Sequence, residues 1–272
     1  VGNINSSAYI YSAAALIVNG KTPPLAFDFV NSYYRNSGND STFANSITHS
    51  RASGATMTNS SGNIVSVGIG VPRLGHHVWN GSAWVNEGLL HESEARTNLV
   101  TYSNDFTHSS WTKNATITPN DAVSPDGTSN ASKFSFGGTG YFQFNHSITA
   151  GQKYTISAWV KSYDGTDEAF QLYAQNGAFN QNFIATSEWQ RFSFTYTGTG
   201  ATVNGDGIAR PTSNIPALLH VYGIQIEAGS TPSSYIPTSG SSVTRAADTL
   251  TVPAAKMPWP AISDYVETTG TE

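Results

Sequence analysis

Alternation of apolar and polar residues is the dominant pattern from about residue 96 onward. In "KYTISAWVKS", Tyr154, Ile156, Ala158 and Val160 fall on one face, and Thr155, Ser157, Trp159 and Lys161 fall on the other. "AFQLYAQNG" and "EWQRFSFTYTG" alternate in the same way, and turn-forming stretches such as "SPDGTSN", "YDGTDE" and "GTGATVNGDG" separate such runs. Short strands at this spacing predict an antiparallel β-sandwich.

The two ends of the chain have a different pattern. Residues 48–95 read as short β-hairpins, and "WNGSAW" predicts a two-residue turn at Asn80-Gly81. The most apolar run, residues 8–18, is too short to span a bilayer as a helix and lacks the basic start of a signal peptide. Because the chain begins at Val1 rather than Met, we expect a processed product or a fragment. The Pro-containing tail, residues 239–272, predicts a linker or the start of a further domain.

Composition narrows the function classes. The net charge is −5 and basic residues form no run, which argues against a nucleic-acid partner. Aromatic residues make up 12% of the chain, enough to build a core, whereas disordered segments are poor in aromatics. The chain has no cysteine, so disulfides, thiolate metal sites and a cysteine nucleophile are excluded. A cysteine-free chain rich in Thr, Asn and aromatic residues fits an exposed extracellular or virion surface, and a cytosolic protein with this composition is the alternative.

Several blocks of the sequence resemble a known module. They are "EARTNLVTYSNDFTHSSWTKNATITPNDAVSPDGTSNASKF", "YTISAWVKS", "EWQRFSFTYTG" and "GIQIEAGSTPSSYIPTSGSSVTRAAD". In this order they resemble a module of phage structural proteins, especially tail fibres and head fibres or spikes. "THSRASGATMTNSSGNIV" and "VPRLGHHVWNGSAWVNEGLLHESEARTNL" look like the leader that precedes it. The resemblance covers about residues 48–248.

The resemblance implies a fold and a division of the chain. We expect an all-β protein whose residues 96–238 form an antiparallel β-sandwich, a jelly roll like that of carbohydrate-binding modules. A smaller β-rich N-terminal region would precede it, with a β-hairpin leader at 48–95. Residues 1–47 match no block of the family and would suit a particle anchor or an oligomerisation segment.

The resemblance also implies a function. The chain would lie on the virion surface as a homotrimer, bind host or environmental polysaccharide, and contact other virion proteins. It would need no cofactor, no nucleic acid and no insertion into a membrane.

A glycan site requires aromatic rings that stack on sugar CH groups, and amides that bind hydroxyls. Trp159, Tyr173, Gln171 and Gln175 lie opposite the apolar set of their strands and are the candidates for the concave face. Asn176, Phe179, Asn180 and Asn182, in "QNGAFNQNF", would form a loop at its rim. For Trp159 and Tyr173 the alternative is burial in the core. Trp111 and Trp189 lie in family blocks and are expected to be structural.

The resemblance further implies a structural calcium ion, held by oxygen ligands from the first and last strands of the jelly roll. Asn104, Asp105 and Glu227 occupy those regions. The alternative is that Asp105 caps a turn and Glu227 pairs on the surface.

"HESEAR" gathers His91, Glu92, Glu94 and Arg96 within six positions of a chain in which charged residues are only 11%. Glu92 and Glu94 would suit an acid–base pair. The position of the stretch at the entry of the module favours a joint, in which Arg96 pairs with Glu94 or another carboxylate. His76 and His77, together with His91, make a weak zinc set, because adjacent strand residues point to opposite faces.

Catalysis has little support in the sequence, and we assign no catalytic residue. "GxSxG" is absent, and the acidic cluster Asp164, Asp167 and Glu168 lies in the turn "YDGTDE". Three hypotheses remain: a non-catalytic glycan-binding fibre or spike protein, a purely structural virion component, and a glycan depolymerase or esterase.

Overall fold

The computed structural model describes residues 2–3, 25–137, 140–200, 204–210 and 217–256. The chain divides into two compact units. The composite unit comprises residues 1–62, 66–94 and 246–272, and the sandwich unit comprises residues 63–65 and 95–245. The division after residue 94 lies beside the expected start of the jelly roll at residue 96. The apolar run 8–18 and the end of the tail, residues 257–272, lie outside the described residues.

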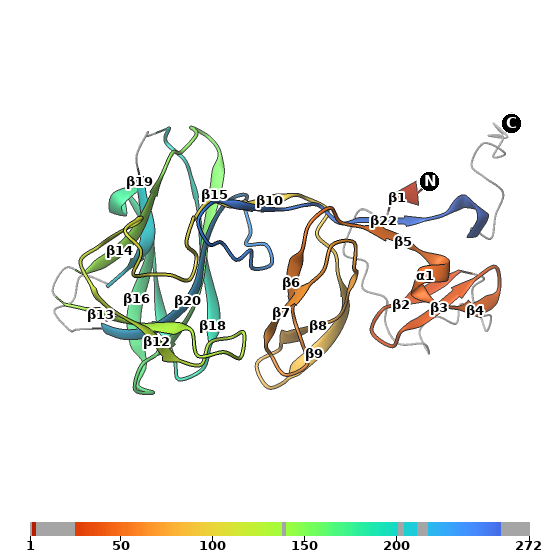
Figure 1. The fold of residues 1–272 in the computed structure, drawn as a ribbon, viewed down its shortest axis with the longest axis horizontal. Coiled ribbons are helices and arrows are strands. Elements are labelled where there is room, and N and C mark those ends of the chain that lie inside the picture. Colours follow the sequence, from red (N-terminus) through yellow and green to blue (C-terminus); the bar gives the residue numbers. More distant parts are fainter. Residues whose placement is uncertain (1, 4–24, 138–139, 201–203, 211–216, 257–272) are drawn as a thin grey trace, which may run out of the picture. The chain divides into compact units, whose positions relative to one another are not determined.

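Two five-stranded antiparallel sheets build the sandwich unit (Figure 1). Sheet A has the order β11-β14-β19-β16-β17, formed by Trp111–Lys113, Tyr141–His146, Asn204–Ala209, Glu168–Ala174 and Phe179–Ala185. Sheet B has the order β12-β13-β20-β15-β18, formed by Thr116–Ala122, Ala131–Phe136, Ala217–Ala228, Lys153–Ser162 and Gln190–Thr197. The predicted all-β fold, an antiparallel β-sandwich of the jelly-roll type, is confirmed.

Strand alternation fills the space between the two sheets. Phe170, Leu172 and Ala174 are 0% exposed, as their spacing in the sequence predicts. Ile156 and Val160 of sheet B belong to the same core cluster. Phe134 and Phe142, one from each sheet, pack with their ring centroids 4.6 Å apart. Burying large apolar side chains from both sheets is the main source of stability for such a unit.

The composite unit consists of short strands. They are β1 (Gly2–Asn3), β2 (Ala26–Asp28), β3 (Tyr33–Asn36), β4 (Asn39–Ser41), β5 (Thr48–Ser50), β6 (Ala55–Thr58), β7 (Ile64–Val67), β8 (Arg73–Trp79), β9 (Trp84–Leu90) and β22 (Thr249–Val252). The last two residues of β7, 66 and 67, belong to this unit and the first two to the sandwich unit. A single helical turn, α1 (Phe43–Ser46), starts at Thr42, whose side chain accepts a hydrogen bond from the Asn45 N–H. No helix in the described ranges is long and apolar enough to cross a membrane.

The β8–β9 hairpin forms where the sequence predicts it, but its turn is longer. Trp79 pairs with Trp84, and the Asn80 N–H donates to the Ala83 carbonyl, so the loop has four residues rather than two. Asn80 Oδ1 accepts from the N–H groups of Ser82 and Ala83, at 3.0 Å each. This capping by the side chain stabilises the longer loop.

The tail is not a linker over its described part. Strand β21 (Val243–Arg245) pairs with β10 (Arg96–Asn98), and β22 pairs with both β1 and β5. The prediction of a linker or incomplete domain is therefore wrong for residues 243–252, where short strands without clear alternation complete sheets begun much earlier in the chain.

Candidate functional site

The outer face of sheet A is polar but uncharged. Alternation and register turn the following residues away from the core: Thr112, Tyr141, Gln143, Asn145, Ala169, Gln171, Tyr173, Asn180, Asn182, Ile184, Gly205, Gly207 and Ala209. None of these outward residues carries a charge. Amides and hydroxyls dominate the set, and those groups both donate and accept hydrogen bonds.

Gly205 and Gly207 of the central strand, β19, leave space on this face for the side chains of neighbouring strands. Gly207 lies between Gln143 and Tyr173, and the Tyr173 hydroxyl donates to Gln143 Oε1 across it at 2.8 Å. At Gly205 a Cβ atom would lie 2.1 Å from Cδ of Gln143. Without side chains at these two positions, the amide of Gln143 lies directly over the strand.

The amides form two hydrogen-bonded groups, one around Gln143 and one that pairs Gln171 with Asn182. Gln143 Nε2 donates to Asn145 Oδ1 at 3.1 Å and lies 3.4 Å from Asn176 Oδ1. Asn145 Nδ2 donates to Thr112 Oγ1 at 3.1 Å, and Gln171 Nε2 donates to Asn182 Oδ1 at 3.2 Å. Mutual hydrogen bonds orient these side chains before a ligand binds, which reduces the entropy that binding would cost.

A strained turn delivers Asn176 to the group around Gln143. Gln175 and Asn176 have φ values of 52° and 56°, in the left-handed region that residues other than glycine seldom adopt. Asn176 Oδ1 accepts from the Gly205 N–H at 3.1 Å. Asp206 Oδ1 accepts from the Gln175 N–H at 3.0 Å. Such strain, held by surrounding contacts, is often found at functional sites.

Asp206 anchors this turn from inside the sandwich. Its side chain is 0% exposed, and Oδ2 lies 2.8 Å from Nε2 of His146. The Tyr196 hydroxyl donates to the same oxygen. Burial, and then the nearby Asp206 carboxylate, raise the pKa of Tyr196 above its ordinary value, so the hydroxyl stays a donor.

Tyr173 belongs to the candidate face but offers little ring surface. Only 5% of the residue is exposed. Burial raises the pKa of Tyr173 above its ordinary value, so its hydroxyl remains protonated and fixes Gln143. Tyr141, on the same face, is half-buried and is the more accessible ring.

Five of the residues predicted to bind a glycan lie on or beside this face: Gln171, Tyr173, Asn176, Asn180 and Asn182. Trp159, Gln175 and Phe179 do not join them. This corrects the expectation of one shared face.

The reason differs for each of the three. Trp159 lies on β15 of sheet B, where the Arg191 guanidinium lies 4.4 Å from its ring centroid. Gln175 is 7% exposed, and its Oε1 accepts from Thr199. Phe179 faces inward and stacks on Tyr196, with 5.9 Å between the two ring centroids. Alternation assigns faces within a strand but does not say to which sheet the strand belongs.

The sequence reasoning missed Thr112, Tyr141, Gln143 and Asn145. The signal was present in "YFQFNH", where Tyr141, Gln143 and Asn145 alternate with apolar residues in the manner used for β16.

The expected calcium ligands bond with protein groups. Asn104 Oδ1 lies 3.4 Å from the backbone nitrogen of Gly223, and Glu227 lies four residues further along β20. The Glu227 carboxylate is buried and accepts from Gln225 and Ser233. Asp105 accepts from Thr107, which lowers its pKa. Protein donors thus already bond with Asp105 and Glu227, and the calcium ion stays a prediction.

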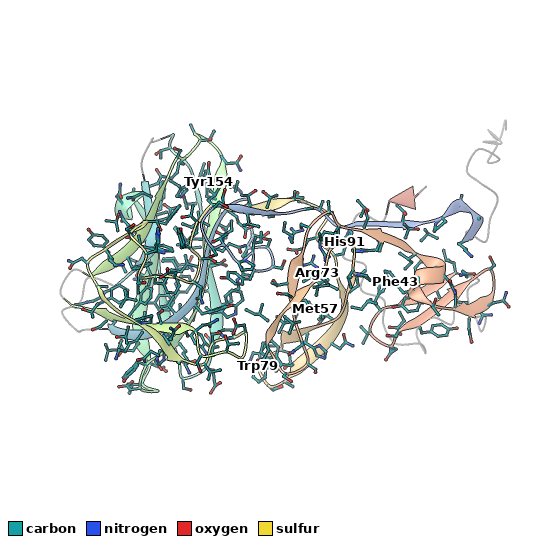
Figure 2. The ribbon with its side chains drawn as sticks, in the orientation of Figure 1. Phe43, Met57, Arg73, Trp79, His91 and Tyr154 are labelled. Atoms are coloured by element: carbon teal, nitrogen blue, oxygen red, sulfur yellow. The ribbon has the colours of Figure 1, made fainter. Side chains whose placement is uncertain are left out.

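The charged stretch at residues 91–96 leads to a buried ion network in the composite unit, and Figure 2 labels Arg73, which belongs to this network, and His91. Glu92 Oε2 accepts from Arg73 at 2.6 Å. Asp248 accepts from Arg51 at 3.0 Å, from Arg73 at 2.5 Å and from the Glu92 N–H at 2.8 Å. Arg51, Arg73 and Asp248 have side chains that are 0% exposed. Glu92 thus serves in a salt-bridged joint within this unit.

Burial opposes ionisation of Asp248, but the Glu92 N–H and the two guanidinium groups outweigh it and hold its pKa at about 2. The Arg96 guanidinium also donates to the Ala228 carbonyl within the sandwich unit.

The histidines do not form a metal site. Within the described ranges, no group of three or more His, Asp or Glu residues could hold a metal ion. His76 Nδ1 accepts from the Thr58 N–H, and burial lowers the pKa of both His76 and His91. Partial burial disfavours the charged form of both rings.

The remaining candidates have ordinary surroundings. Trp111 is buried and donates to the Tyr102 carbonyl at 3.1 Å, and Trp189 donates to the Val123 carbonyl at 3.0 Å. Asp164 accepts from Thr166 in an exposed turn, which lowers the pKa of the Asp164 carboxyl.

Comparison with known proteins gives similar structures but no family. No protein-family model matches the chain, and neither does any curated protein. Similar solved structures include an arabinose-bound GH51 α-L-arabinofuranosidase, with 14% identity, coverage of 49% of this chain and 25% of that chain, and a TM-score of 0.37. The CBM22-1 xylan-binding domain of Paenibacillus barcinonensis Xyn10C has 13% identity, coverage of 53% and 99%, and a TM-score of 0.35.

The enzymatically active domain of bacteriophage CBA120 tailspike protein 4 has 12% identity, coverage of 48% of this chain and 21% of that chain, and a TM-score of 0.35. The matched part of this chain therefore spans about a quarter of the arabinofuranosidase and about a fifth of the tailspike domain.

Proposed function

We propose that this protein is a virion fibre or spike component that binds glycans, without transforming them, on the outer face of sheet A. The observation that carries the proposal is a row of outward amides on neighbouring strands, in which Gln143 bonds with Asn145 and Asn176, and Gln171 bonds with Asn182. Neutral sugars present hydroxyls that pair with amides, and the half-buried ring of Tyr141 offers an apolar contact for sugar CH groups.

The character of the face supports binding rather than hydrolysis. A glycosidase places two carboxylates about 5 to 10 Å apart across the scissile bond. The outward positions of the described strands of sheet A carry no carboxylate. Binding through neutral amides needs no cofactor.

The virion location rests on the ordered sequence blocks between residues 48 and 248 that resemble phage fibre and spike proteins. With that location come the host or environmental polysaccharide as ligand, other virion proteins as partners, and a homotrimer as the assembly. These parts of the proposal stay predictions.

A glycan array followed by calorimetry on the full chain tests the binding function. Asn182→Ala removes the partner of Gln171 and should weaken binding about ten-fold, since a ligand hydrogen bond is worth about 1 kcal/mol and the orientation of Gln171 is disturbed as well. Gln181→Ala is the matched control, because Gln181 is the exposed neighbour that points to the other side of β17.

Affinity within about two-fold of the parent is expected for the control. If the parent chain binds no glycan, the structural hypothesis replaces this one. Equal affinities of the two variants would place the binding site elsewhere.

A further inference from the structure

A row of basic side chains crosses the outer face of sheet B. The register pairs Lys133 of β13 with His220 of β20, and pairs His220 with Lys161 of β15. Like charges directly opposite each other on neighbouring strands destabilise a sheet. In a chain of net charge −5, two ammonium groups that flank one imidazole form an unusual local concentration of positive charge.

One carboxylate compensates part of this charge. Asp121 Oδ2 lies 2.8 Å from His220 Nε2, and Oδ1 lies 3.9 Å from Lys133 Nζ. A register shift in β12 between Thr118 and Ala122 positions Asp121, and Asn120 takes a φ of 55° there. Bulges of this kind redirect a side chain and are often found next to functional sites.

Lys161 is left uncompensated. Its ammonium lies 5.3 Å from the centroid of the Trp189 ring, and within the described residues it forms no ion pair. An anion placed between Lys161 and Lys133 would gain charge-assisted hydrogen bonds from both.

His220 adds a hydrogen-bond acceptor. A carboxylate only accepts, so Nε2 donates to Asp121, and in the tautomer with its proton on Nε2 the other ring nitrogen, Nδ1, is an acceptor. Nδ1 is buried and has no hydrogen-bond partner among the described residues, and the side chain is only 7% exposed. A buried acceptor without a partner is unfavourable, and a ligand hydroxyl would satisfy it. The side chain of Lys133 is flexible, and its movement would let a ligand hydroxyl reach His220 Nδ1.

An aromatic ring completes the cluster. Tyr163 is 41% exposed, and its ring centroid lies 5.2 Å from that of His220. Lys133 Nζ lies 4.9 Å from the centre of the same ring. Two cationic donors, one acceptor and an accessible ring match a ligand that has an anionic group, hydroxyl donors and an apolar CH face.

We propose that this cluster is a second saccharide site, which binds acidic sugar residues through their carboxylate. Lys133 and Lys161 hold the carboxylate, His220 Nδ1 accepts a hydroxyl, and Tyr163 stacks on the sugar ring. The site is independent of the uncharged face of sheet A, because the outer faces of the two sheets point away from each other. One chain then distinguishes neutral from acidic glycan segments.

Calorimetry of the full chain with polygalacturonate, and separately with a neutral polysaccharide from the glycan array, tests this site. The double variant Lys133→Gln/Lys161→Gln should bind polygalacturonate about ten-fold more weakly. Lys153→Gln is the matched control, because Lys153 is exposed on the same face of β15, about 26 Å from Lys161. Its affinity should stay within about two-fold of the parent.

A further variant tests the sign of the electrostatic effect. Asp121→Asn removes the competing carboxylate and should strengthen polygalacturonate binding by about two-fold or more. Thermal unfolding verifies that each variant is folded.

The proposal is overturned if polygalacturonate does not bind, if Lys153→Gln loses as much affinity as the double variant, or if Asp121→Asn binds more weakly while folded. Inorganic sulfate that competes as well as monomeric galacturonate would show recognition of the anion alone and would also overturn it. Asn182→Ala, by contrast, should leave polygalacturonate binding unchanged, so failure of the sheet A site and failure of this one give different results.

Discussion

The interiors of the two units are built on different principles. In the sandwich unit, alternating strands bury Phe142, Ile156 and Leu172 between two sheets. The composite unit has sheets of only two or three strands and a small apolar cluster, and it also buries Arg51, Arg73 and Asp248. Where the strands do not form two large packed sheets, buried ion pairs join segments that are far apart in the sequence. One chain therefore contains a unit whose interior is mainly apolar and a unit whose interior includes a network of buried ions.

Removing the central carboxylate should have the largest effect. Asp248→Ala leaves two buried guanidinium groups without their shared partner, and should destabilise the composite unit by about 3–5 kcal/mol. Hydrogen exchange measured by mass spectrometry at increasing denaturant resolves the two units. Asp40→Ala, at a carboxylate that is 78% exposed, is the control and should change stability by less than about 0.5 kcal/mol. A small effect of Asp248→Ala would contradict the ion-based core.

A cavity in the sandwich should have a slightly smaller effect, confined to that unit. Leu172→Ala removes a side chain that is 0% exposed and should cost about 3 kcal/mol. Ile184→Ala, at a residue 51% exposed on the same sheet, should cost less than about 1 kcal/mol. If peptides of the composite unit lose protection to the same degree in Leu172→Ala, the two cores are not independent.

Acid should weaken the composite unit through Asp248. The pKa of this carboxyl is about 2 in the folded protein, below the unfolded value of about 3.9. A lowered folded pKa gives stability that is present above the unfolded pKa and is lost as pH falls toward the folded one. We expect a loss of about 2 kcal/mol between about pH 5 and pH 2. An Asp248→Asn variant whose stability has the same pH dependence as the parent would contradict this cause.

Sequence predicted the sandwich better than the composite unit, for a physical reason. Alternation within β15 and β16 is local, so the buried faces of Ile156 and Phe170 follow from a few neighbouring residues. The ion network joins Arg51 to Asp248, which are 197 positions apart, and no local pattern connects them. "HESEAR" showed that charge was concentrated, but not that Glu92 pairs with Arg73.

The sequence predicted only part of the candidate site, because alternation within a strand is a local pattern whereas contacts between strands are not. Gln171 was found because β16 alternates, whereas Asn182 was expected in a rim loop and instead lies on β17, paired with Gln171. Trp159 was grouped with them because periodicity gives the face of a residue within its strand and not the sheet that the strand joins. The glycines at 205 and 207 matter through cross-strand neighbours, which only the register shows.

The most direct test of the central claim is a titration of isotope-labelled full-length protein with a neutral glycan that the array identifies, followed by NMR of the side-chain amide groups. We expect the NH₂ signals of Gln143, Gln171 and Asn182 to shift with a single common affinity, and that of Gln181 to stay unchanged. Saturable glycan binding that leaves those three signals unmoved would contradict the placement of the binding site on the outer face of sheet A.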